Sequence, residues 1–341
     1  MARLLVRCME QAGHKVSVIS ELRAYLNDAD DTQGWAALQT NASHESERIT
    51  GQWAKNGPAD LWFCYHPYYK SPDLIGPMLA KRFGISYVTC EASYSSRRNI
   101  GIWADMQAHA LSAINQAGIN LCVTKRDRLG LLAAAPQANL VRFPPFIETD
   151  VFDTIPTPVA GHMVCAAMMR KGDKFESYKM LAAALSLLPE NRDWHLSVAG
   201  DGPVRADVHA LFAEIPLHRV TWLGQLDRSQ IASLFATGAV YVWPGCGEAY
   251  GLAYLEAQAA GLPVLAQAVA GVPEVVVNGV TGILTHAHDN ADFAKAIVQL
   301  LSDVALQRQM GQAARRHVLA HHSLNGAALK LNQILQNAVA E

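Results

Sequence analysis

Short apolar runs alternate with amphipathic stretches along most of the chain. The runs are rich in β-branched and aromatic residues, which is typical of buried strands, and the stretches between them carry apolar residues at helical spacing. Strands separated by helices predict parallel sheets with right-handed crossovers. The predicted strands are 15–20, 60–66, 85–90, 119–123, 162–168, 194–199, 219–223, 239–243 and 263–266.

The predicted helices lie between these runs. Proline near the start and glycine at the end mark the helix over 71–84, the asymmetry expected of helix termini. The tail over 306–339 is also predicted to be helical, with a break near 321–325. The other predicted helices are 1–12, 35–53, 103–117, 125–134, 176–188, 204–214, 229–236, 251–260 and 289–301.

The chain begins on a helix, which Gly13 ends before the KVSVIS run of 15–20. An alternating α/β chain usually begins on a strand followed by a loop that faces a ligand. Two interpretations stay open at this point. Either the first strand of the domain and its loop are missing, or the domain simply begins with a helix.

A segment rich in proline and glycine, FDTIPTPVAG at 152–161, divides the pattern into two halves. We expect an N-terminal Rossmann-like domain over 1–152, a linker at 153–161 and a second Rossmann-like domain over 162–305. Helices over 306–341 would follow and could cross back to the first domain. Ligands of such domains bind where the strand carboxyl ends face the cleft between them.

Composition narrows the class of protein. Half of the 341 residues are hydrophobic and 17% are charged, as in globular chains, and the net charge of −2 gives no support for nucleic-acid binding. The six cysteines form no CxxC pair, which disfavours a zinc site or a disulfide framework. No apolar run approaches the roughly 20 residues of a membrane span, and no signal-peptide pattern opens the chain. We therefore expect a cytoplasmic protein.

The stretch WPGCGEAYGLAYLEAQAAG at 243–261 is predicted to be a strand end, a glycine-containing loop and a helix. Unpaired main-chain N–H groups and the helix dipole make such a helix start favourable for an anion. Glu248 and Glu256 flank the predicted start, where carboxylates can accept hydrogen bonds from hydroxyl groups. A ligand with both a diphosphate and sugar hydroxyls fits this arrangement.

Four sequence blocks in the second half closely resemble the C-terminal domain of family 4 retaining glycosyltransferases, which have the GT-B fold. The N-terminal half is similar to that family only in its rhythm of strands and helices. The blocks are GDGP at 200–203, VTWLGQL at 220–226, WPGCGEAYGLAYLEAQAAGLPVLA at 243–266 and GVPEVVVNGVTGIL at 271–284.

The resemblance implies roles for residues of the third block. Glu248 matches the acid that contacts the hydroxyls of the donor sugar, and Glu256 matches the acid that binds the ribose. Gly251 and Leu252 match positions whose main-chain N–H groups hold the donor diphosphate, and Tyr250 is placed with them in the donor site. Considered alone, Glu248 could instead be an acid of the first helical turn and Glu256 an exposed helix residue.

Basic residues upstream match a second part of the family pattern. The resemblance implies that Arg170 and Lys174 clamp the diphosphate, whose charge grows as the nucleotide departs. Lys171 lies between them and the family's usual Lys-Gly pair is absent, so solvated surface charge is the alternative. Gly200 belongs to a tight turn and is assigned to the donor site. The GDGP turn is not GxGxxG, so it gives no support for NAD.

The first domain departs from the family. A histidine that members carry after the strand at 85–90 is replaced by Glu91, and the preceding strand ends in His66. Either residue could reach the reaction centre, where Glu91 could stabilise positive charge or accept the acceptor's proton. His66 could instead bond a main-chain carbonyl.

The resemblance implies a retaining, metal-independent glycosyltransferase that needs no cofactor. Its donor would be a nucleotide diphosphate sugar, with UDP or GDP as the nucleotide, and its acceptor the hydroxyl of a glycan, a lipid or a small molecule. Contact with a membrane would be peripheral. Two alternatives stay open: a sugar-nucleotide epimerase or phosphorylase of the same fold, and an inactive nucleotide-sugar-binding or scaffold subunit.

Overall fold

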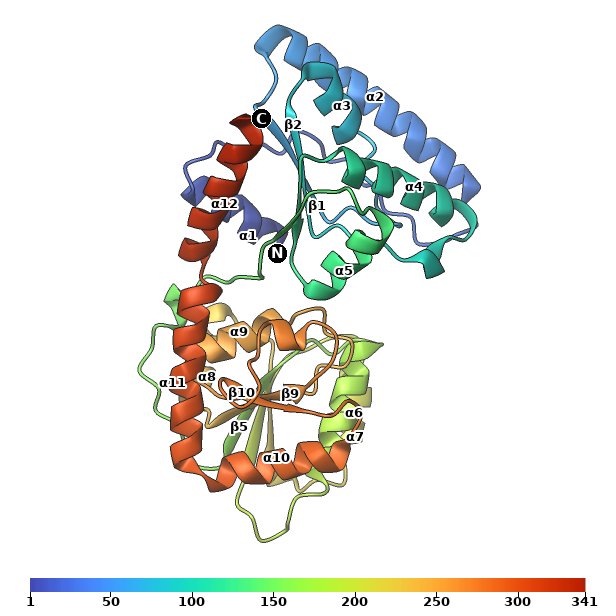
Figure 1. Cartoon of the computed structure of the whole chain (residues 1–341). Coiled ribbons are helices and arrows are strands. Elements are labelled where there is room, and N and C mark those ends of the chain that lie inside the picture. Colours follow the sequence, from blue (N-terminus) through green and yellow to red (C-terminus); the bar gives the residue numbers. More distant parts are fainter. Residues whose placement is uncertain (341) are drawn as a thin grey trace. The chain divides into compact units, whose positions relative to one another are not determined.

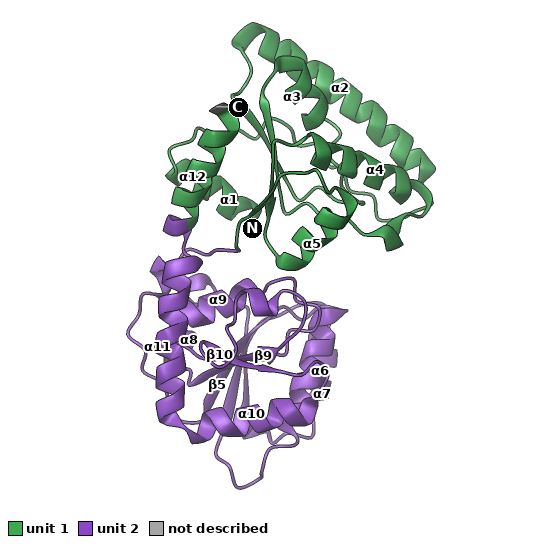
Figure 2. Cartoon of the chain, viewed as in Figure 1, with its two compact units in different colours: residues 1–144, 327–341 green, residues 145–326 purple. Residues whose placement is uncertain are grey.

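The computed structural model describes residues 1–340 and divides the chain into two compact units. Unit 1 contains residues 1–144 together with the C-terminal residues from 327 on, and unit 2 contains residues 145–326 (Figure 2). The division falls between Pro144 and Pro145, ahead of the segment for which we expected a linker. The C-terminal end of the chain returns to the first unit.

The sheet of unit 1 has four parallel strands in chain order, β1-β2-β3-β4. Three of them confirm the predicted strands over 60–66, 85–90 and 119–123. The inner strands β2 and β3 are almost fully buried, as expected of a parallel sheet covered on both faces, and their buried polar residues Thr89 and Asn120 are hydrogen-bonded to each other. The strands are β1 (Leu61–Tyr65), β2 (Ser86–Cys90), β3 (Ile119–Cys122) and β4 (Leu140–Arg142).

Helices cover both faces of this sheet. In Figure 1, α2, α3 and α4 lie on one side and α1 and α12 on the other. The helix predicted over 71–84 begins later than expected, because the Asp73 carboxylate accepts hydrogen bonds from Ile75 N–H and Gly76 N–H and holds a turn there. The helices are α1 (Ala2–Gln11), α2 (Thr32–Asn56), α3 (Gly76–Phe83), α4 (Gly101–Gln116), α5 (Lys125–Ala134) and α12 (Leu324–Ala340).

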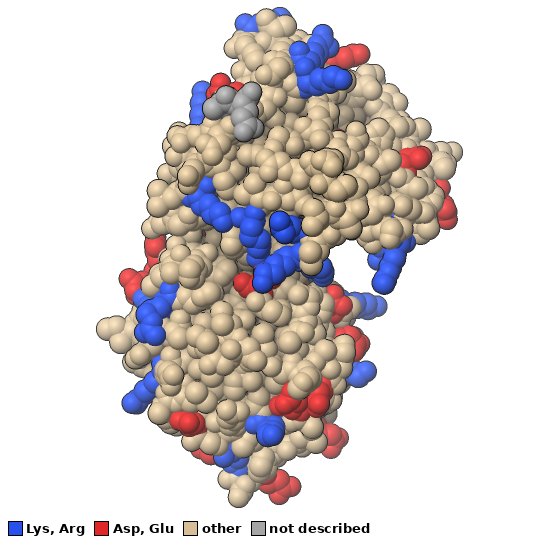
Figure 3. Space-filling model, viewed as in Figure 1, with Lys and Arg blue, Asp and Glu red and all other residues tan. Residues whose placement is uncertain are grey.

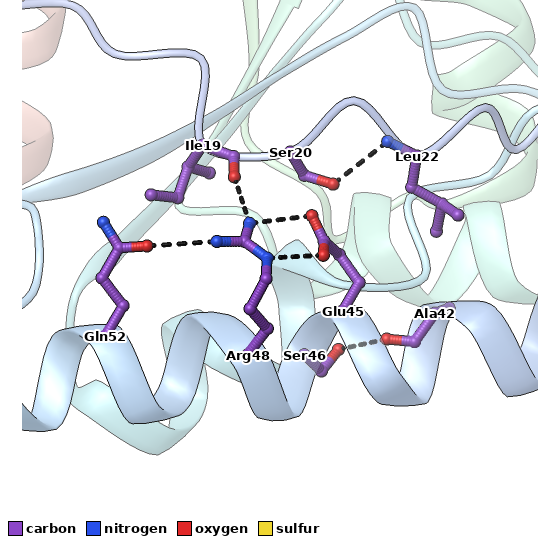
Figure 4. Close-up of polar contacts among 8 residues, drawn as sticks. All are labelled: Ile19, Ser20, Leu22, Ala42, Glu45, Ser46, Arg48 and Gln52. Carbon is purple, nitrogen blue, oxygen red and sulfur yellow. Dashed lines mark hydrogen bonds and ion pairs between the residues drawn. The ribbon is translucent and has the colours of Figure 1, made fainter.

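The predicted strand over 15–20 is wrong, because this segment joins neither sheet of the described residues. It runs beside α2, where the Arg48 guanidinium donates a 2.7 Å hydrogen bond to the main-chain oxygen of Ile19 and also bonds both carboxylate oxygens of Glu45 (Figure 4). The Val18 residue is 74% exposed. An alternating pattern makes a strand only where a neighbouring strand pairs with its main chain.

The sheet of unit 2 has six parallel strands in the order β10-β9-β8-β5-β6-β7. Five of them confirm the predicted strands of this half, and β10 was not predicted. The chain leaves β5 toward one edge through β6 and β7 and then returns to β8 on the other side of β5. The strands are β5 (His162–Ala166), β6 (His195–Ala199), β7 (Val220–Gly224), β8 (Val240–Val242), β9 (Val264–Gln267) and β10 (Gly282–Thr285).

The helices of unit 2 confirm the predicted ones to within a few residues. The break predicted near 321–325 is present, since α11 ends at His321 and α12 begins at Leu324. The large side chains buried in this unit include Trp243 and three tyrosines. The helices are α6 (Asp173–Leu185), α7 (Arg205–Leu211), α8 (Arg228–Thr237), α9 (Leu252–Ala259), α10 (Asn290–Ser302) and α11 (Val304–His321).

Charged side chains stand in scattered groups on the face drawn in Figure 3, and neutral ones cover most of it. This agrees with the charged fraction of 17%. None of the helices found in residues 1–340 combines the length and the apolar character that crossing a membrane requires.

Candidate functional site

The carboxyl ends of β5 and β8 mark the point of unit 2 where the strand order reverses. In open parallel sheets the loops that leave two such strands diverge, and ligands bind in the crevice between them. The loops that follow β5, β6 and β8 contain most of the residues predicted for the donor site. We therefore describe this end of the sheet first.

The loops after β5 and β6 are joined main chain to main chain. Ala167 N–H donates to Ala199 oxygen at 3.0 Å, and Met169 N–H donates to Asp201 oxygen at 2.9 Å. Gly200 lies so close to the first loop that a Cβ atom added there would be 1.9 Å from the Ala167 oxygen. Only glycine permits this approach, which gives the GDGP turn a structural reason.

The loop after β8 ends at Gly251, whose φ of 65° is left-handed and which is followed by Leu252 as the first residue of α9. This confirms the predicted order of strand, loop and helix. The first N–H groups of a helix have no partner within the helix, so this terminus favours an anion. Tyr250 is half-buried and packs against the core of unit 2.

The structure brings Lys174 of α6 and Glu248 of the β8 loop together, although they are 74 positions apart in the sequence. Their side chains form an ion pair, with 18% and 19% of the side-chain areas exposed. The Lys174 ammonium also lies 5.5 Å from the centre of the Trp243 ring, within reach of a cation–π interaction. Arg170 has a different environment from Lys174: its side chain is exposed, and no ion pair within residues 1–340 includes it.

Glu256 lies on α9, beyond the first helical turn, and is half-buried. Burial raises the pKa of its carboxyl group, while the positive charge of Arg228 on α8 opposes this effect. Arg228 itself forms an ion pair with Glu148. The carboxylate of Glu256 is thus partly desolvated, and the charge of Arg228 offsets part of that cost.

Two residues of this end of unit 2 were not predicted. Ser177 of α6 accepts a 2.9 Å hydrogen bond from Cys246 N–H and so ties the Glu248 loop to α6. Arg228 is the first residue of α8, and Asp227 caps the helix. The sequence at this point indicates the start of a helix but gives no sign that Arg228 belongs to a ligand site. Both act through contacts between distant segments, which local patterns do not reveal.

The candidate residues of unit 1, His66 and Glu91, follow the adjacent strands β1 and β2. Both have left-handed backbones, with φ of 60° and 59°, which is unusual for residues other than glycine. His66 Nδ1 lies 3.2 Å from the main-chain oxygen of Glu91 and 3.9 Å from its Oε1. The contact with a main-chain carbonyl, one of the two roles foreseen for His66, is present. Strained backbones of this kind concentrate at functional sites.

No group of three or more His, Cys, Asp or Glu residues within the described part of the chain is placed to hold a metal ion.

Residues 168–317 match the model of the family described as "Glycosyl transferases group 1". A curated relative, the D-inositol 3-phosphate glycosyltransferase of Corynebacterium diphtheriae, is 30% identical over 215 residues, which are 60% of this chain and 50% of that protein. Its counterpart in Corynebacterium aurimucosum is 28% identical over 65% of this chain and 56% of its own length. The chain thus spans about half the length of the curated relatives it matches.

Solved structures extend the likeness to both units. Sucrose-phosphate synthase from Thermosynechococcus elongatus superposes with a TM-score of 0.69 at 22% identity, over 89% of this chain and 79% of that one. The Anabaena protein HepE in complex with UDP gives a TM-score of 0.71 at 14% identity, over 86% and 82%. The fold is therefore the GT-B fold, as predicted.

Proposed function

We propose that the protein is a family 4 glycosyltransferase that moves a sugar from a nucleotide diphosphate sugar to a hydroxyl group, with retention at the anomeric carbon. The observation that carries the proposal is the cluster of Lys174, Glu248 and the start of α9. A cation, a carboxylate and a helix N-terminus meet there at the point where the strand order of unit 2 reverses. These are the groups that a diphosphate joined to a sugar requires.

The diphosphate would be held by main-chain and cationic donors. The main-chain N–H groups of Gly251 and Leu252 at the start of α9 would donate to it, aided by the helix dipole, and Lys174 and Arg170 would supply positive charge. Gly200 lets the neighbouring turn approach without a side chain in the way. With these cations in place the reaction would not depend on a metal ion, and transfer is expected to be unchanged by EDTA.

The two glutamates would bind hydroxyl groups. Glu248 would accept hydrogen bonds from the transferred sugar and Glu256 from the ribose, with Tyr250 between them beside the nucleotide. In the free protein Lys174 already has Glu248 as its partner. On binding, the diphosphate would take over Lys174 while the sugar hydroxyls take over Glu248, so neither charge is left unpaired.

Retention would follow from front-side attack, in which the departing phosphate helps to remove the proton of the acceptor hydroxyl. His66 and Glu91 are the candidates of unit 1 for contact with the reacting sugar. Glu91 could also act as a nucleophile in a double displacement. Trapping a covalent sugar on Glu91 would support that route, and full activity of Glu91→Gln would exclude it.

The comparisons suggest the first ligands to test. HepE was solved with UDP, so UDP and UDP-sugars come first as donors, followed by GDP-sugars. The relatives named as D-inositol 3-phosphate glycosyltransferases point to a small phosphorylated polyol as one acceptor class. Glycan and lipid acceptors complete the set.

The test is a thermal-shift screen of the full chain with UDP-, GDP- and ADP-sugars. A ligand present at 100 times its Kd stabilises the folded state by about 2.7 kcal/mol, which predicts a rise in Tm of about 4 °C or more. The Glu256→Ala variant should lose this rise. The proposal fails if no nucleotide sugar changes the Tm of the wild-type protein.

A second assay separates transfer from the alternatives. Incubation with the stabilising donor alone should leave its sugar unchanged, whereas an epimerase would convert it without an acceptor. Donor binding without transfer to any of the three acceptor classes would favour a binding or scaffold subunit.

A further inference from the structure

Three tyrosines lie fully buried directly beneath the donor half-site of unit 2, each with 0% of its area exposed. They come from three different elements, α6, β8 and α9. Each hydroxyl group donates a hydrogen bond to a main-chain oxygen at the carboxyl end of β5 or β8. The pairs are Tyr178 with Ala167 at 2.7 Å, Tyr241 with Ala166 at 3.2 Å and Tyr254 with Trp243 at 3.0 Å.

These oxygens lie where the strands end and their loops diverge. A buried main-chain oxygen needs a hydrogen-bond donor, and beyond the last pair of a strand the sheet no longer supplies one regularly. The tyrosine hydroxyls meet this need at β5 and at β8, the two strands between which the order reverses. They therefore determine the direction in which each loop leaves the sheet.

The side chain of Tyr254, which belongs to α9, packs against both ends of the loop that carries Glu248. A Cβ atom added at Gly245 would be 2.1 Å from the Tyr254 hydroxyl, and one added at Gly251 would be 2.4 Å from its ring carbon Cδ2. The two ends of the loop thus press against opposite parts of one ring. Glu248 lies midway in the sequence between these two glycines, so the ring supports the loop on both sides of this residue.

Tyr178 holds the other pair of loops. Its hydroxyl bonds the Ala167 oxygen, and a Cβ atom added at Gly200 would lie 3.3 Å from the same hydroxyl. The loop after β5 carries Arg170, and the turn after β6 begins at Gly200. Tyr178 therefore joins the two segments that we assign to the diphosphate.

We propose that Tyr178 and Tyr254 are positioning residues that act on different parts of the donor. Tyr178 fixes the loops that bind the diphosphate, and Tyr254 fixes the loop whose Glu248 binds the transferred sugar. Tyr241 connects them, since its hydroxyl bonds the oxygen of Ala166 and its ring lies 5.7 Å from that of Tyr254. The assignment of ligand parts rests on the proposed function.

Replacement of tyrosine by phenylalanine tests the hydroxyl alone, because the ring that fills the core is kept. The variants are Tyr178→Phe and Tyr254→Phe. The matched control is Tyr87→Phe in unit 1, where a tyrosine that is 3% exposed donates a 3.1 Å hydrogen bond to the Asp73 carboxylate. All three lose one buried hydrogen bond, and only two of them lose it beneath the donor half-site.

Isothermal titration with UDP and with the UDP-sugar that stabilises the wild type most strongly separates the two roles. Tyr254→Phe should keep the Kd for UDP within about twofold and raise the Kd for the UDP-sugar about tenfold, since a well-placed hydrogen bond from the sugar to a charged group such as Glu248 is worth about that factor. Tyr178→Phe should weaken UDP and the UDP-sugar alike, by about five- to tenfold. Tyr87→Phe should change neither binding constant.

Amide hydrogen exchange of the ligand-free protein tests separately whether each tyrosine holds its own loop in place. Tyr254→Phe should speed exchange at 245–250 about tenfold and leave 167–170 unchanged, and Tyr178→Phe should do the reverse. Equal changes at both loops in both variants, or no change in either, would overturn the positioning roles. If the wild type binds no nucleotide, the proposed function fails while these exchange rates still decide the roles of the tyrosines.

Discussion

Glu256 shows how one side chain can serve binding at the expense of stability. Burial raises the pKa of its carboxyl group, so the folded chain holds this proton more tightly than the unfolded chain does. The cost of the charge is present above the raised pKa and disappears as the pH falls below it. In the proposed function, in contrast, donor binding needs the charged form of Glu256 to accept hydrogen bonds from the ribose hydroxyls.

The Glu256→Gln variant should therefore separate the two effects. At pH 7 its Tm should exceed that of the wild type, and its affinity for UDP should be about 10- to 100-fold lower, the usual loss for hydrogen bonds to a charged group. The advantage in Tm should shrink as the pH falls through the raised pKa. Calorimetry and titration at several pH values measure both. A lower Tm at pH 7 would contradict the assignment of burial as the dominant cause.

The ion pair of Lys174 and Glu248 leads to a second prediction at the same scale. A diphosphate must compete with Glu248 for the Lys174 ammonium. Glu248→Gln removes this competitor, so UDP should bind about threefold more tightly. Sugar transfer should fall by at least about a hundredfold, because the variant loses a charged contact with the sugar in the transition state. Titration and a transfer assay measure the two effects. Weaker UDP binding in this variant would show that the pair does not oppose the diphosphate.

Among the elements, the start of α9 depends on the left-handed conformation of Gly251. Alanine at this position would be strained by the left-handed backbone. Its Cβ atom would also clash with the Tyr254 ring, 2.4 Å away. We expect Gly251→Ala to lower the free energy of unfolding by about 2–4 kcal/mol. Gly279→Ala is the matched control, because its φ of 75° is similar and nothing lies within 4 Å of its added Cβ. The control should lose only about 1–2 kcal/mol in urea unfolding, and equal losses would refute the steric contribution.

Elements also show where sequence patterns succeed and fail. The strands β2 and β3 were predicted from short runs rich in apolar residues, which suit a strand enclosed on both faces. The run at 15–20 alternates apolar and polar residues and makes no strand, because pairing depends on a neighbour that the run itself does not specify. β10 was missed although it pairs with β9 over four residues.

At the scale of the whole molecule, the residues that we propose for the donor half-site and the core beneath them lie within unit 2. The buried cluster around β5 and β8 runs from Ile147 to Val318, within the bounds of this unit. A fragment of residues 145–326 should therefore fold and bind UDP within about threefold of the full chain, and it should not transfer sugar. Circular dichroism and titration test this. A folded fragment that does not bind UDP would show that unit 1 is needed for the donor.

The amino-acid sequence by itself determined most of the order of strands and helices, and with it the strand, loop and helix that place Glu248, Gly251 and Glu256. These features depend on periodicity and on glycine and helix-end preferences over a few residues, which act locally. Only the tertiary structure decided that Lys174 meets Glu248, that His66 and Glu91 have left-handed backbones, and that the hydroxyls of buried tyrosines bond main-chain oxygens where the loops begin. Such contacts join segments far apart in the chain, and they are fixed by packing and by the demand of buried polar groups for partners.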